Sequence, residues 1–596
     1  MKNGILLFLA LCLMIPGYSQ YQKTDDRPKV GVVLSGGGAK GLAHIGALKV
    51  IEEAGIKVDY IGGTSMGAII GALYASGYSA VELDSMFMET DFPELIQDDF
   101  PRSAKSFYEK DDTERYALTI PFNDFKIAFP QALSGGQKIY NQLVKLLYHV
   151  KDTEDFSELP IPFLCIATNI ETGEEILLNQ GFLPEAIMAS GTFPSLFEPT
   201  VVDGQILIDG GVLNNYPVEE VRAMGADIMI GVDVQHGLRQ RESLESASDI
   251  LLQINNFRTV KDMSVKSAMT DIYIKPDMDD FTVIDFDQKE TIINKGIEAA
   301  LTEEEALKQL AGSQGMIPKI GSPISVSDSL VINRLVIEGD QGSSRGFIKG
   351  KLRFDLGETI AFEELHQGIG NLAATGNFKA IRYELTSNGL GEDLVLKLRE
   401  NINKTYLRVG AHYDQLYKSA AMINITRKHF LANDDTASFD FILGDNVRYN
   451  MEYYIDKGRY WSIGVNSRLN DFSKDIDFDV IQSNFSVLEN PNINTINLDV
   501  DDVTNQFYLQ TDFREEFALR LGIEHKYLKY ASETINDMGT LLNDPQQAEP
   551  AVFEKSHYYS SFGQLVLDTY DDKYYPTRGL YFDGDFHLYL FSSDFN

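Results

Sequence analysis

Three short segments of this chain contain residue types that together could carry out nucleophilic catalysis. The first is a glycine run that directly follows the apolar segment KVGVVLS, and it reads Gly36-Gly37-Gly38-Ala39-Lys40-Gly41. The others are Gly63-Thr64-Ser65-Met66-Gly67 and Asp209-Gly210-Gly211. A serine becomes a strong nucleophile when a base removes its proton, and backbone N–H groups can stabilise the oxyanion that follows. The segments therefore supply a candidate nucleophile, base and oxyanion donors.

The spacing around Ser65 is that of a nucleophile elbow. Gly63 and Gly67 flank it because neighbouring side chains would clash in the sharp strand-to-helix turn that exposes such a serine. Ser65 ends the apolar segment VDYIGG and opens a stretch rich in glycine and alanine, as an elbow requires. Ser344 has the same spacing, but it follows a polar loop and lacks an upstream glycine run. We therefore predict that Ser65 is the nucleophile.

The glycine run supports two interpretations. Gly36, Gly38 and Gly41 fit the dinucleotide fingerprint G-x-G-x-x-G, in which a pyrophosphate lies at a helix N-terminus. The N–H groups of Gly36, Gly37 and Gly38 could equally form an oxyanion hole. A dinucleotide site needs an acidic residue at the end of the next strand, whereas that strand here ends at the Ser65 elbow. The oxyanion interpretation is favoured.

Asp209 is the best candidate for the base. It ends the short strand QILID, and Gly210 and Gly211 allow the backbone after it to approach another loop. An ordinary turn aspartate is the alternative at this point. His236 is a rival base, because it follows ADIMIGVDVQ in the order Ser, Asp, His of an α/β-hydrolase triad. We expect His44 and His149 to be packing or surface residues.

The order of apolar segments predicts three regions after residue 19. Between residues 29 and 315, apolar strands alternate with small-residue helices, which predicts an α/β three-layer domain with a largely parallel sheet. A segment rich in Gly, Pro and Ser then marks a boundary. Residues 328–402 follow the order strand, helix, helix, strand, strand, as in a small α+β module. From residue 404 to 596, about ten aromatic-rich segments alternate strictly between apolar and polar residues, which predicts an antiparallel transmembrane β-barrel, with a soluble sandwich as the alternative.

Charge and the N-terminus restrict the partners and the compartment. The net charge of −36, from 52 basic and 88 acidic residues, argues against binding to nucleic acid. Residues 1–19 have the pattern of a secretory signal peptide, and lipidation at Cys12 is a weaker alternative because Leu11 precedes it. Removal of the signal leaves Cys165 alone, so no intramolecular disulfide is expected.

The three chemical motifs, taken in their order, resemble the defining motifs of the patatin-like phospholipase family. Residues 189–194 and 214–217 are also similar to family sequences, and the resemblance covers residues 29–311. It implies a Ser65–Asp209 dyad without histidine, with Gly37 and Gly38 as oxyanion donors, and ester hydrolysis without a metal or an organic cofactor. Motif-supporting roles fall to Lys40, Gly41, Gly63, Gly67, Gly210 and Gly211. We expect Lys40 to be a solvated or loop-positioning charge that could attract anionic headgroups, and residues 119–149 to shape the pocket.

The rest of the chain resembles parts of outer-membrane proteins. Gly376-Asn377-Phe378, entering a strand, resembles the POTRA module, and Pro576-Thr577-Arg578-Gly579 resembles a barrel element of the superfamily that carries such modules. The family's pore-loop motif, however, occurs only as Arg345-Gly346-Phe347 within the POTRA-like segment, and the strands are few. We therefore expect an incomplete barrel and a C-terminally truncated chain.

Together these features resemble the patatin-type autotransporters of Gram-negative outer membranes. The resemblance implies export through a signal peptide, an outer-membrane location with the hydrolase at the cell surface or in the periplasm, and a membrane lipid or other acyl ester as substrate. The rival interpretation is an outer-membrane transport or assembly protein whose N-terminal domain only binds lipid or protein.

Overall fold

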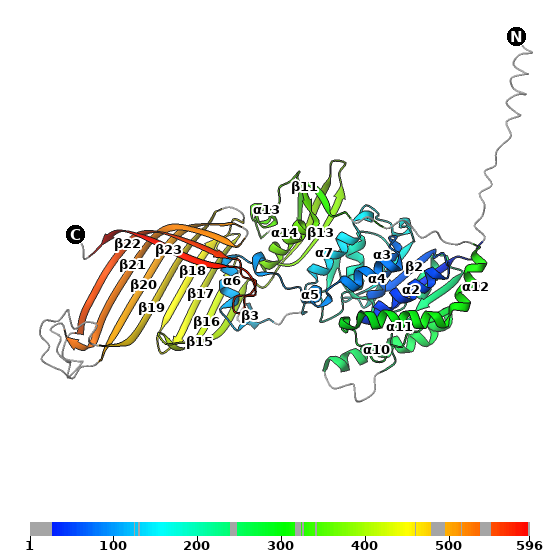
Figure 1. The fold of residues 1–596 in the computed structure, drawn as a ribbon, viewed down its shortest axis with the longest axis horizontal. Helices are drawn as coiled ribbons and strands as arrows, with labels where there is room; N and C mark the ends of the chain where they lie inside the picture. Colours follow the sequence, from blue (N-terminus) through cyan, green and yellow to red (C-terminus); the bar gives the residue numbers. More distant parts are fainter. Residues whose placement is uncertain are drawn as a thin grey trace, which may run out of the picture.

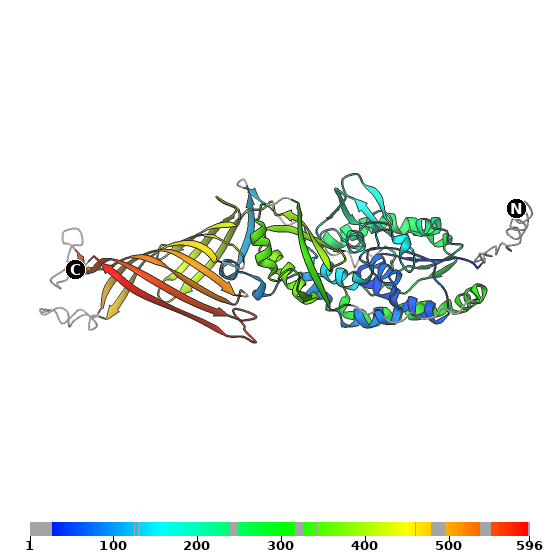
Figure 2. The ribbon, with the colours of Figure 1, turned by 90° about the horizontal axis from the view of Figure 1, so that it is seen from above.

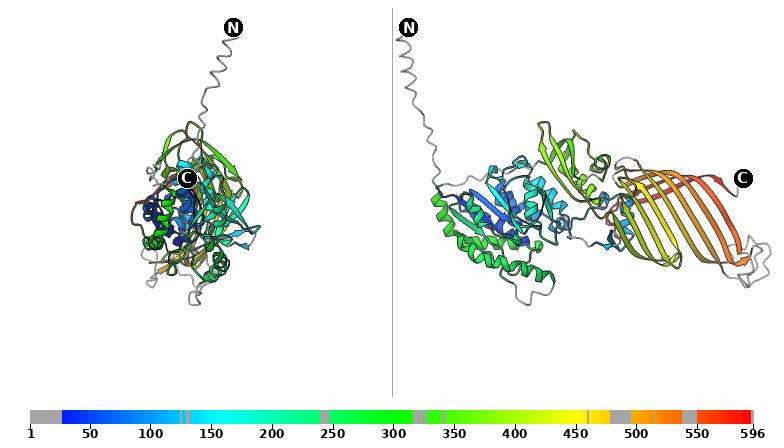
Figure 3. Two further views of the ribbon diagram at one scale, coloured as in Figure 1. Left: turned by 90° about the vertical axis from the view of Figure 1, so that its right-hand side faces the viewer. Right: turned by 180° about the vertical axis from the view of Figure 1, so that it is seen from behind.

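Three folded parts follow one another along the molecule: an N-terminal α/β domain, a small α+β module and a large curled sheet (Figures 1 and 3). This computed structural model describes residues 27–596 except 124–125, 129–131, 239–246, 316–323, 325–326, 340–341, 459–460, 478–494, 514, 537–549 and 594–596. The predicted signal peptide and Cys12 lie outside the described residues, as does most of the predicted boundary after residue 315.

Among the described residues, the sheet of the N-terminal domain has eight strands in the order β10-β9-β1-β2-β5-β8-β7, with β6 paired to β5. The strands from β10 to β5 are parallel, and β8 runs antiparallel to β5. Their bounds are β1 (Val30–Leu34), β2 (Tyr60–Thr64), β5 (Phe163–Asn169), β6 (Glu174–Leu178), β7 (Thr200–Val202), β8 (Gln205–Asp209), β9 (Ile228–Val232) and β10 (Ile272–Ile274). All residues of β1 and β5 are buried, as expected for parallel strands covered on both faces.

Helices cover both faces of this sheet. One core packs β1, β2 and β5 against α2, α3, α8 and α11, and a second core packs the other face against α9 and α10. The bounds are 3₁₀ helix η1 (Gly38–Leu42), α2 (Ala43–Glu53), α3 (Met66–Ala75), α4 (Ala80–Glu89), α5 (Phe92–Gln97), α7 (Gln137–Leu146), α8 (Leu183–Ser190), α9 (Val218–Ala223), α10 (Ala247–Lys266), α11 (Lys289–Thr302) and α12 (Glu304–Gln314). The predicted α/β three-layer fold is confirmed.

The small module has the expected order of elements, with one addition. Its sheet has the order β12-β11-β14-β13, and the short strand β12 between the two helices was not predicted. The bounds are β11 (Ser329–Gly339), α13 (Arg345–Leu352), β12 (Thr359–Ala361), α14 (Phe362–Ala374), β13 (Phe378–Ser387) and β14 (Glu392–Glu400). Its assignment as a POTRA module remains a prediction.

The large sheet is curled and antiparallel, and nine of its strands come from residues 405–592 (Figure 2). Polar side chains of these strands are buried, for example Asn424 and Gln510, whereas apolar ones such as Phe507 and Ile523 are exposed. A soluble sandwich would bury its apolar face instead, so this pattern favours a barrel in lipid. The bounds are β15 (Thr405–Asp414), β16 (Lys418–Lys428), β17 (Asp435–Gly444), β18 (Arg448–Ile455), β19 (Trp461–Asp477), β20 (Thr495–Phe513), β21 (Phe517–Asn536), β22 (Pro550–Asp568) and β23 (Tyr581–Ser592).

One segment within the range predicted for the N-terminal domain lies with the barrel instead. Residues 102–123, here called the arm, contain η2 (Arg102–Ala104), α6 (Phe107–Glu114) and β3 (Leu118–Asn123), and β4 (Lys126–Ile127) follows. β3 pairs with β15, so the barrel sheet has eleven strands in the described residues. The first residues of the 119–149 region, 119–123, therefore do not shape a pocket, although α7 does.

Candidate active site

Ser65 occupies the turn between β2 and α3, as the predicted elbow requires. Its backbone has φ 56° and ψ −124°, a combination that residues other than glycine rarely adopt. Such strain persists only where the surrounding structure enforces it, and it is concentrated at functional sites. The strained turn places the Ser65 side chain at the carboxyl-terminal edge of the parallel sheet.

The flanking glycines are required by close contacts between backbone segments. A Cβ atom at Gly63 would lie 2.4 Å from the carbonyl oxygen of Gly67, and one at Gly67 would lie 2.3 Å from that of Leu34. Gly210 is similarly restricted, because its Cβ would lie 2.2 Å from Ile166 O. These neighbours are backbone atoms that cannot rotate away, so the turn needs glycine on both sides of the serine.

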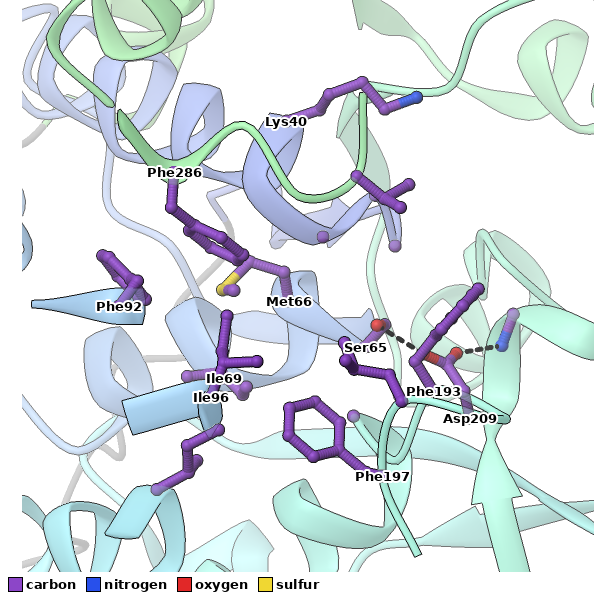
Figure 4. Close-up of a pocket in the computed structure, with 18 of the residues that line it drawn as sticks. Lys40, Ser65, Met66, Ile69, Phe92, Ile96, Phe193, Phe197, Asp209 and Phe286 are labelled. Carbon is purple, nitrogen blue, oxygen red and sulfur yellow. Dashed lines mark hydrogen bonds between the residues drawn. The ribbon is translucent and has the colours of Figure 1, made fainter. Parts of the chain in front are cut away.

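The structure brings Ser65 and Asp209 into direct contact. Ser65 Oγ donates a hydrogen bond of 2.6 Å to Asp209 Oδ2, and Asp209 Oδ1 accepts one of 2.7 Å from the N–H of Gly211 (Figure 4). The sheet explains this contact, because Asp209 ends β8, β8 pairs with β5, and β5 lies next to β2. The nucleophile and the base predicted from separate motifs thus meet without an intervening residue.

Burial changes the acid–base behaviour of the Asp209 carboxyl. The side chain is 4% exposed, and burial raises its pKa to about 6 against the opposing effects of the Ser65 and Gly211 hydrogen bonds. A carboxylate with a raised pKa binds a proton more readily, which is what a general base must do. It still ionises above pH 6.

The glycine run lies directly against the elbow. A Cβ atom at Gly36 would lie 3.0 Å from the Cβ of Ser65, and the Gly36 N–H donates a hydrogen bond of 3.2 Å to Asn215 O. This N–H is therefore engaged, which corrects the prediction that Gly36 is an oxyanion donor. Gly37 and Gly38 remain candidates, because they precede and begin η1, where backbone N–H groups have no partner within the helix.

Lys40 is buried, which contradicts a solvated charge but is compatible with the alternative, a loop-positioning charge. Its side chain is only 3% exposed, and Figure 4 shows it directed away from Ser65. The next residue, Gly41, lies against the elbow helix, where a Cβ would be 2.5 Å from Met66 Cγ. Gly41 thus serves close packing, while Lys40 belongs to the lining of the pocket that contains Ser65.

The three histidines considered as bases, His44, His149 and His236, take no part in the contact between Ser65 and Asp209. His44 is fully buried with Nε2 2.7 Å from Ser35 O, and burial lowers its pKa to about 4, so it is a neutral packing residue as expected. His149 Nε2 lies 3.0 Å from Ser76 O, outside the elbow. His236 lines the same pocket as Ser65. Because Ser65 reaches Asp209 directly, however, the geometry does not require His236 as an intermediate base.

An apolar pocket extends from Ser65 between the helices on one side of the sheet. Its walls come from α3, α5, α7 and the loops after α8 and before α11, and they include Ile69, Phe92, Ile96, Phe193, Phe197 and Phe286 (Figure 4). Aliphatic and aromatic walls of this kind bind hydrocarbon by removing it from water. The pocket therefore fits an acyl chain whose ester carbonyl lies at Ser65.

Two positioning interactions were not predicted from the sequence. Ser190 Oγ accepts a hydrogen bond of 3.0 Å from the N–H of Ser65, and Thr64 Oγ1 donates one of 2.9 Å to Asn214 O. Both partners lie in the stretches that resemble family sequences, 189–194 and 214–217. That resemblance was the available signal, but it assigned these residues no role.

No cluster of three or more His, Cys, Asp or Glu side chains within the described ranges could hold a metal ion. In those same ranges, no helix has the length and apolar character needed to cross a membrane.

Comparison with known proteins assigns both ends of the chain. Residues 32–222 match the family model of the patatin-like phospholipases, and residues 392–596 match that of the OMP85 superfamily. The chain joins a patatin-like domain to an Omp85-superfamily domain. The predicted resemblances of these two regions are thus confirmed.

The curated relatives of the patatin-like domain include lysophospholipases of fungi. Lysophospholipase NTE1 of Debaryomyces hansenii is 27% identical over 318 residues, covering 49% of this chain and 19% of that protein. Lysophospholipase nte1 of Aspergillus fumigatus is 32% identical over 205 residues, covering 34% and 12%. The chain therefore spans less than a fifth of the length of these relatives.

Solved structures with some similarity include those of two bacterial proteins. BamA from Haemophilus ducreyi lacking POTRA domains 1–3 has a TM-score of 0.31 at 15% identity, covering 44% of this chain and 48% of that chain. VipD from Legionella pneumophila has a TM-score of 0.28 at 17% identity, covering 47% and 67%.

Proposed function

We propose that this protein is a serine lipid acyl hydrolase that its barrel holds in the outer membrane. The observation that carries the proposal is the 2.6 Å hydrogen bond from Ser65 to Asp209 in the lining of an apolar pocket. A domain that only binds lipid needs the pocket but has no need for a strained serine beside a buried carboxylate. The match to patatin-like phospholipases supports the same reaction class.

The reaction follows from the geometry. The Asp209 carboxylate accepts the Ser65 proton while Oγ attacks the acyl carbonyl carbon, and the N–H groups of Gly37 and Gly38 bind the oxyanion. The tetrahedral intermediate collapses, the ester C–O bond breaks, and the alcohol leaves with the proton from Asp209. Water then attacks the acyl-serine and gives a proton to Asp209. As the bond between the acyl carbon and Ser65 Oγ breaks, Asp209 returns that proton to Ser65 Oγ, and the fatty acid and free Ser65 are released.

The proposed location follows from the OMP85-superfamily match and from the barrel pattern. The proposal includes export of the protein through the predicted signal peptide. It also divides the chain into a hydrolase domain at about residues 29–315, a small module at 328–402 and a barrel at 404–596. The substrate class is a membrane phospholipid or a related acyl ester, because the pocket walls are apolar and the anchor lies in lipid.

Fatty-acid release from phospholipid vesicles tests this function. Full-length protein reconstituted in vesicles of phosphatidylethanolamine and phosphatidylglycerol should release free fatty acid and lysophospholipid in equal amounts, as measured by mass spectrometry. Vesicles without protein provide the background. Folded protein that binds the vesicles but releases no fatty acid would favour the binding-only alternative.

The raised pKa of Asp209 predicts a specific pH profile. The base works as a carboxylate, so kcat/KM for a soluble short-chain ester should rise with pH through about 6 and level off above it. An aspartate with the ordinary pKa of 3.8 would give a kcat/KM that does not change with pH over the same range. A rate that does not change between pH 5 and pH 7 would contradict the assignment of Asp209 as the base.

Replacement of His236 separates the dyad from a triad. His236→Ala should lower kcat by less than about tenfold, because the variant loses a pocket wall but keeps the Ser65–Asp209 contact. Steady-state kinetics on the same ester measures this. A folded His236→Ala protein that lost several orders of magnitude would show that the histidine is the base.

A further inference from the structure

One wall of the apolar pocket rests on the small module. It consists of α7 and the loop after α8. Its residues in the pocket lining are Ile139, Leu143, Leu146, Phe193, Leu196 and Phe197. Backbone hydrogen bonds join its two parts, because the N–H groups of Ser134 and Glu198 donate over 2.9 and 3.1 Å to Leu196 O and Ser134 O. Residues 133–148 and 193–198 therefore form one unit, here called the α7 wall.

Tyr140 of α7 connects this wall to the small module, whose elements β13 and α14 lie next to α7 (Figure 1). It is fully buried, and its hydroxyl donates a hydrogen bond of 2.9 Å to the carbonyl oxygen of Tyr383 in β13. The two rings meet edge to face with centroids 5.6 Å apart. Ile139 and Leu143, which line the pocket, lie on a different side of the helix. α7 thus presents one side to the pocket and another to the small module.

A buried arginine of the small module packs on the same tyrosine. Arg382 in β13 is 7% exposed, and its guanidinium carbon lies 4.7 Å from the centre of the Tyr140 ring. A cation near the face of an aromatic ring is attracted by it, and the attraction is strongest where water is excluded. Arg382 thus helps to hold Tyr140, and with it α7, against the small module.

Ion pairs join the other part of the α7 wall to the same sheet. Glu198, at the end of the loop, lies 3.9 Å from the ammonium of Lys379 and 3.7 Å from the guanidinium of Arg399. Glu185 in α8 lies 3.4 Å from the ammonium of Lys397. These cations belong to β13 and β14. Partly exposed ion pairs contribute little one by one, so the buried contact between Tyr140 and Arg382 is the main attachment.

The end of α7 is held as well. Tyr148, which follows the helix, donates a hydrogen bond of 2.7 Å to Glu392 Oε1, and its ring lies edge to face with that of Phe362 at 5.1 Å between centroids. The apolar core of the small module is also continuous with that of the N-terminal domain. Domains usually move relative to each other unless their interface is large and apolar. The continuous core indicates that the small module and the α7 wall move together.

We propose that the small module supports the acyl pocket from behind, and that Arg382 is a positioning residue, which keeps Tyr140 and the α7 wall where a long acyl chain can bind. The inference rests on the proposed function for the identity of the substrate, but it concerns the acyl chain rather than the reaction at Ser65.

The length of the acyl chain determines how much the support matters. Each methylene group that the pocket walls remove from water adds to affinity, so a long chain depends on the position of the α7 wall more than a short chain does. Close packing transmits a displacement of Tyr140 to the lining residues beside it. Loss of the support therefore weakens the binding of long chains selectively.

Kinetics on two esters of different chain length test this role in the detergent-solubilised full-length protein. Arg382→Met removes the charge and keeps most of the length of the side chain. It should raise KM for p-nitrophenyl palmitate at least about fivefold, while kcat/KM for p-nitrophenyl butyrate changes less than about twofold. The matched control is Arg334→Met, because Arg334 in β11 pairs with Asp393 inside the small module, and both esters should be cleaved as by wild type.

Two outcomes would overturn the proposal: an unchanged KM for the palmitate ester in folded Arg382→Met, or equal losses on both esters. If Arg382→Met does not fold, Lys379→Ala/Arg399→Ala decides by the same comparison. Its side chains are 20% and 37% exposed, and it removes the ion pairs with Glu198.

Binding of palmitate separates this inference from hydrolysis. Displacement of a fluorescent fatty acid by palmitate, at a fixed detergent concentration and against a background of detergent alone, gives a Kd without ester cleavage. Arg382→Met should raise this Kd at least about fivefold, and Arg334→Met should not. If wild type cleaves no ester but the variants differ in this way, the support stands and the proposed hydrolysis fails. An unchanged Kd for Arg382→Met in a protein that cleaves esters contradicts the support alone.

Discussion

Replacement of Ser65 by alanine should remove ester hydrolysis almost completely, with a fall in kcat/KM of about 10⁴-fold or more. The substitution removes the only atom that can form the acyl-enzyme and leaves the oxyanion donors in place. Ser65 Oγ is the atom held 2.6 Å from Asp209. The change can be measured by stopped assays with a soluble ester and with phospholipid vesicles.

The control for this variant is the other serine with the same sequence spacing. Ser344 lies at the N-cap of α13, where its hydroxyl accepts a hydrogen bond of 3.2 Å from the N–H of Phe347. Ser344→Ala should therefore destabilise α13 slightly, but the folded variant should keep the activity of wild type. If Ser65→Ala retained wild-type turnover while Ser344→Ala lost it, the assignment of the nucleophile would be wrong.

Replacement of Asp209 by asparagine should have the second largest effect, a loss of about 10³-fold in kcat. The side-chain amide has nearly the same shape and can still accept the hydrogen bond from Gly211, but it cannot accept a proton from Ser65. The fold should remain, because an uncharged side chain is easier to bury than a carboxylate. Steady-state kinetics at pH 8 measures the loss.

Two controls make this result specific. Asp203→Asn changes an exposed aspartate in the turn before β8, and its activity should equal that of wild type. The double variant Ser65→Ala/Asp209→Asn should lose little more than Ser65→Ala alone, since the two residues act as one unit. Additive losses would indicate that they act in separate steps.

The parts of the site that local sequence determines were predictable. The elbow at Ser65 depends on a strand, a strained turn and a helix that are contiguous in the chain, and the glycines that allow it are adjacent. Asp209 was identifiable as a candidate base for the same reason, because it ends a strand and precedes two glycines. That the two meet at 2.6 Å was only an inference from family resemblance until the strand order was known.

The errors arose where distant segments decide the environment. The N–H of Gly36 is engaged by Asn215, and Lys40 is buried, although nothing in the glycine run indicates either. The arm is the clearest case. Asp112 lies near residues expected to form a pocket, yet its partner Arg408 is 296 positions away. Polar contacts of this kind have no local periodicity by which a sequence could reveal them.

The faces of the barrel strands were predictable, because the alternation of apolar and polar residues along a strand determines which side chains share a face. Strict alternation placed Arg408 and Tyr413 on opposite faces, and in the structure Arg408 is buried while Tyr413 is exposed. The addition of β3 to β15 was not predictable, because pairing partners at a sheet edge depend on which other segment lies within reach. The short strand β12 escaped prediction because it has only three residues.

Labelling with a fluorophosphonate probe is the most direct test of the central claim, that Ser65 is an activated nucleophile paired with Asp209. The probe should modify folded wild-type protein once, peptide mass spectrometry should locate the adduct on Ser65, and Ser65→Ala should not react. Asp209→Asn should react far more slowly. An adduct on another residue, labelling that persists in Ser65→Ala, or no reaction of folded wild type would contradict the claim.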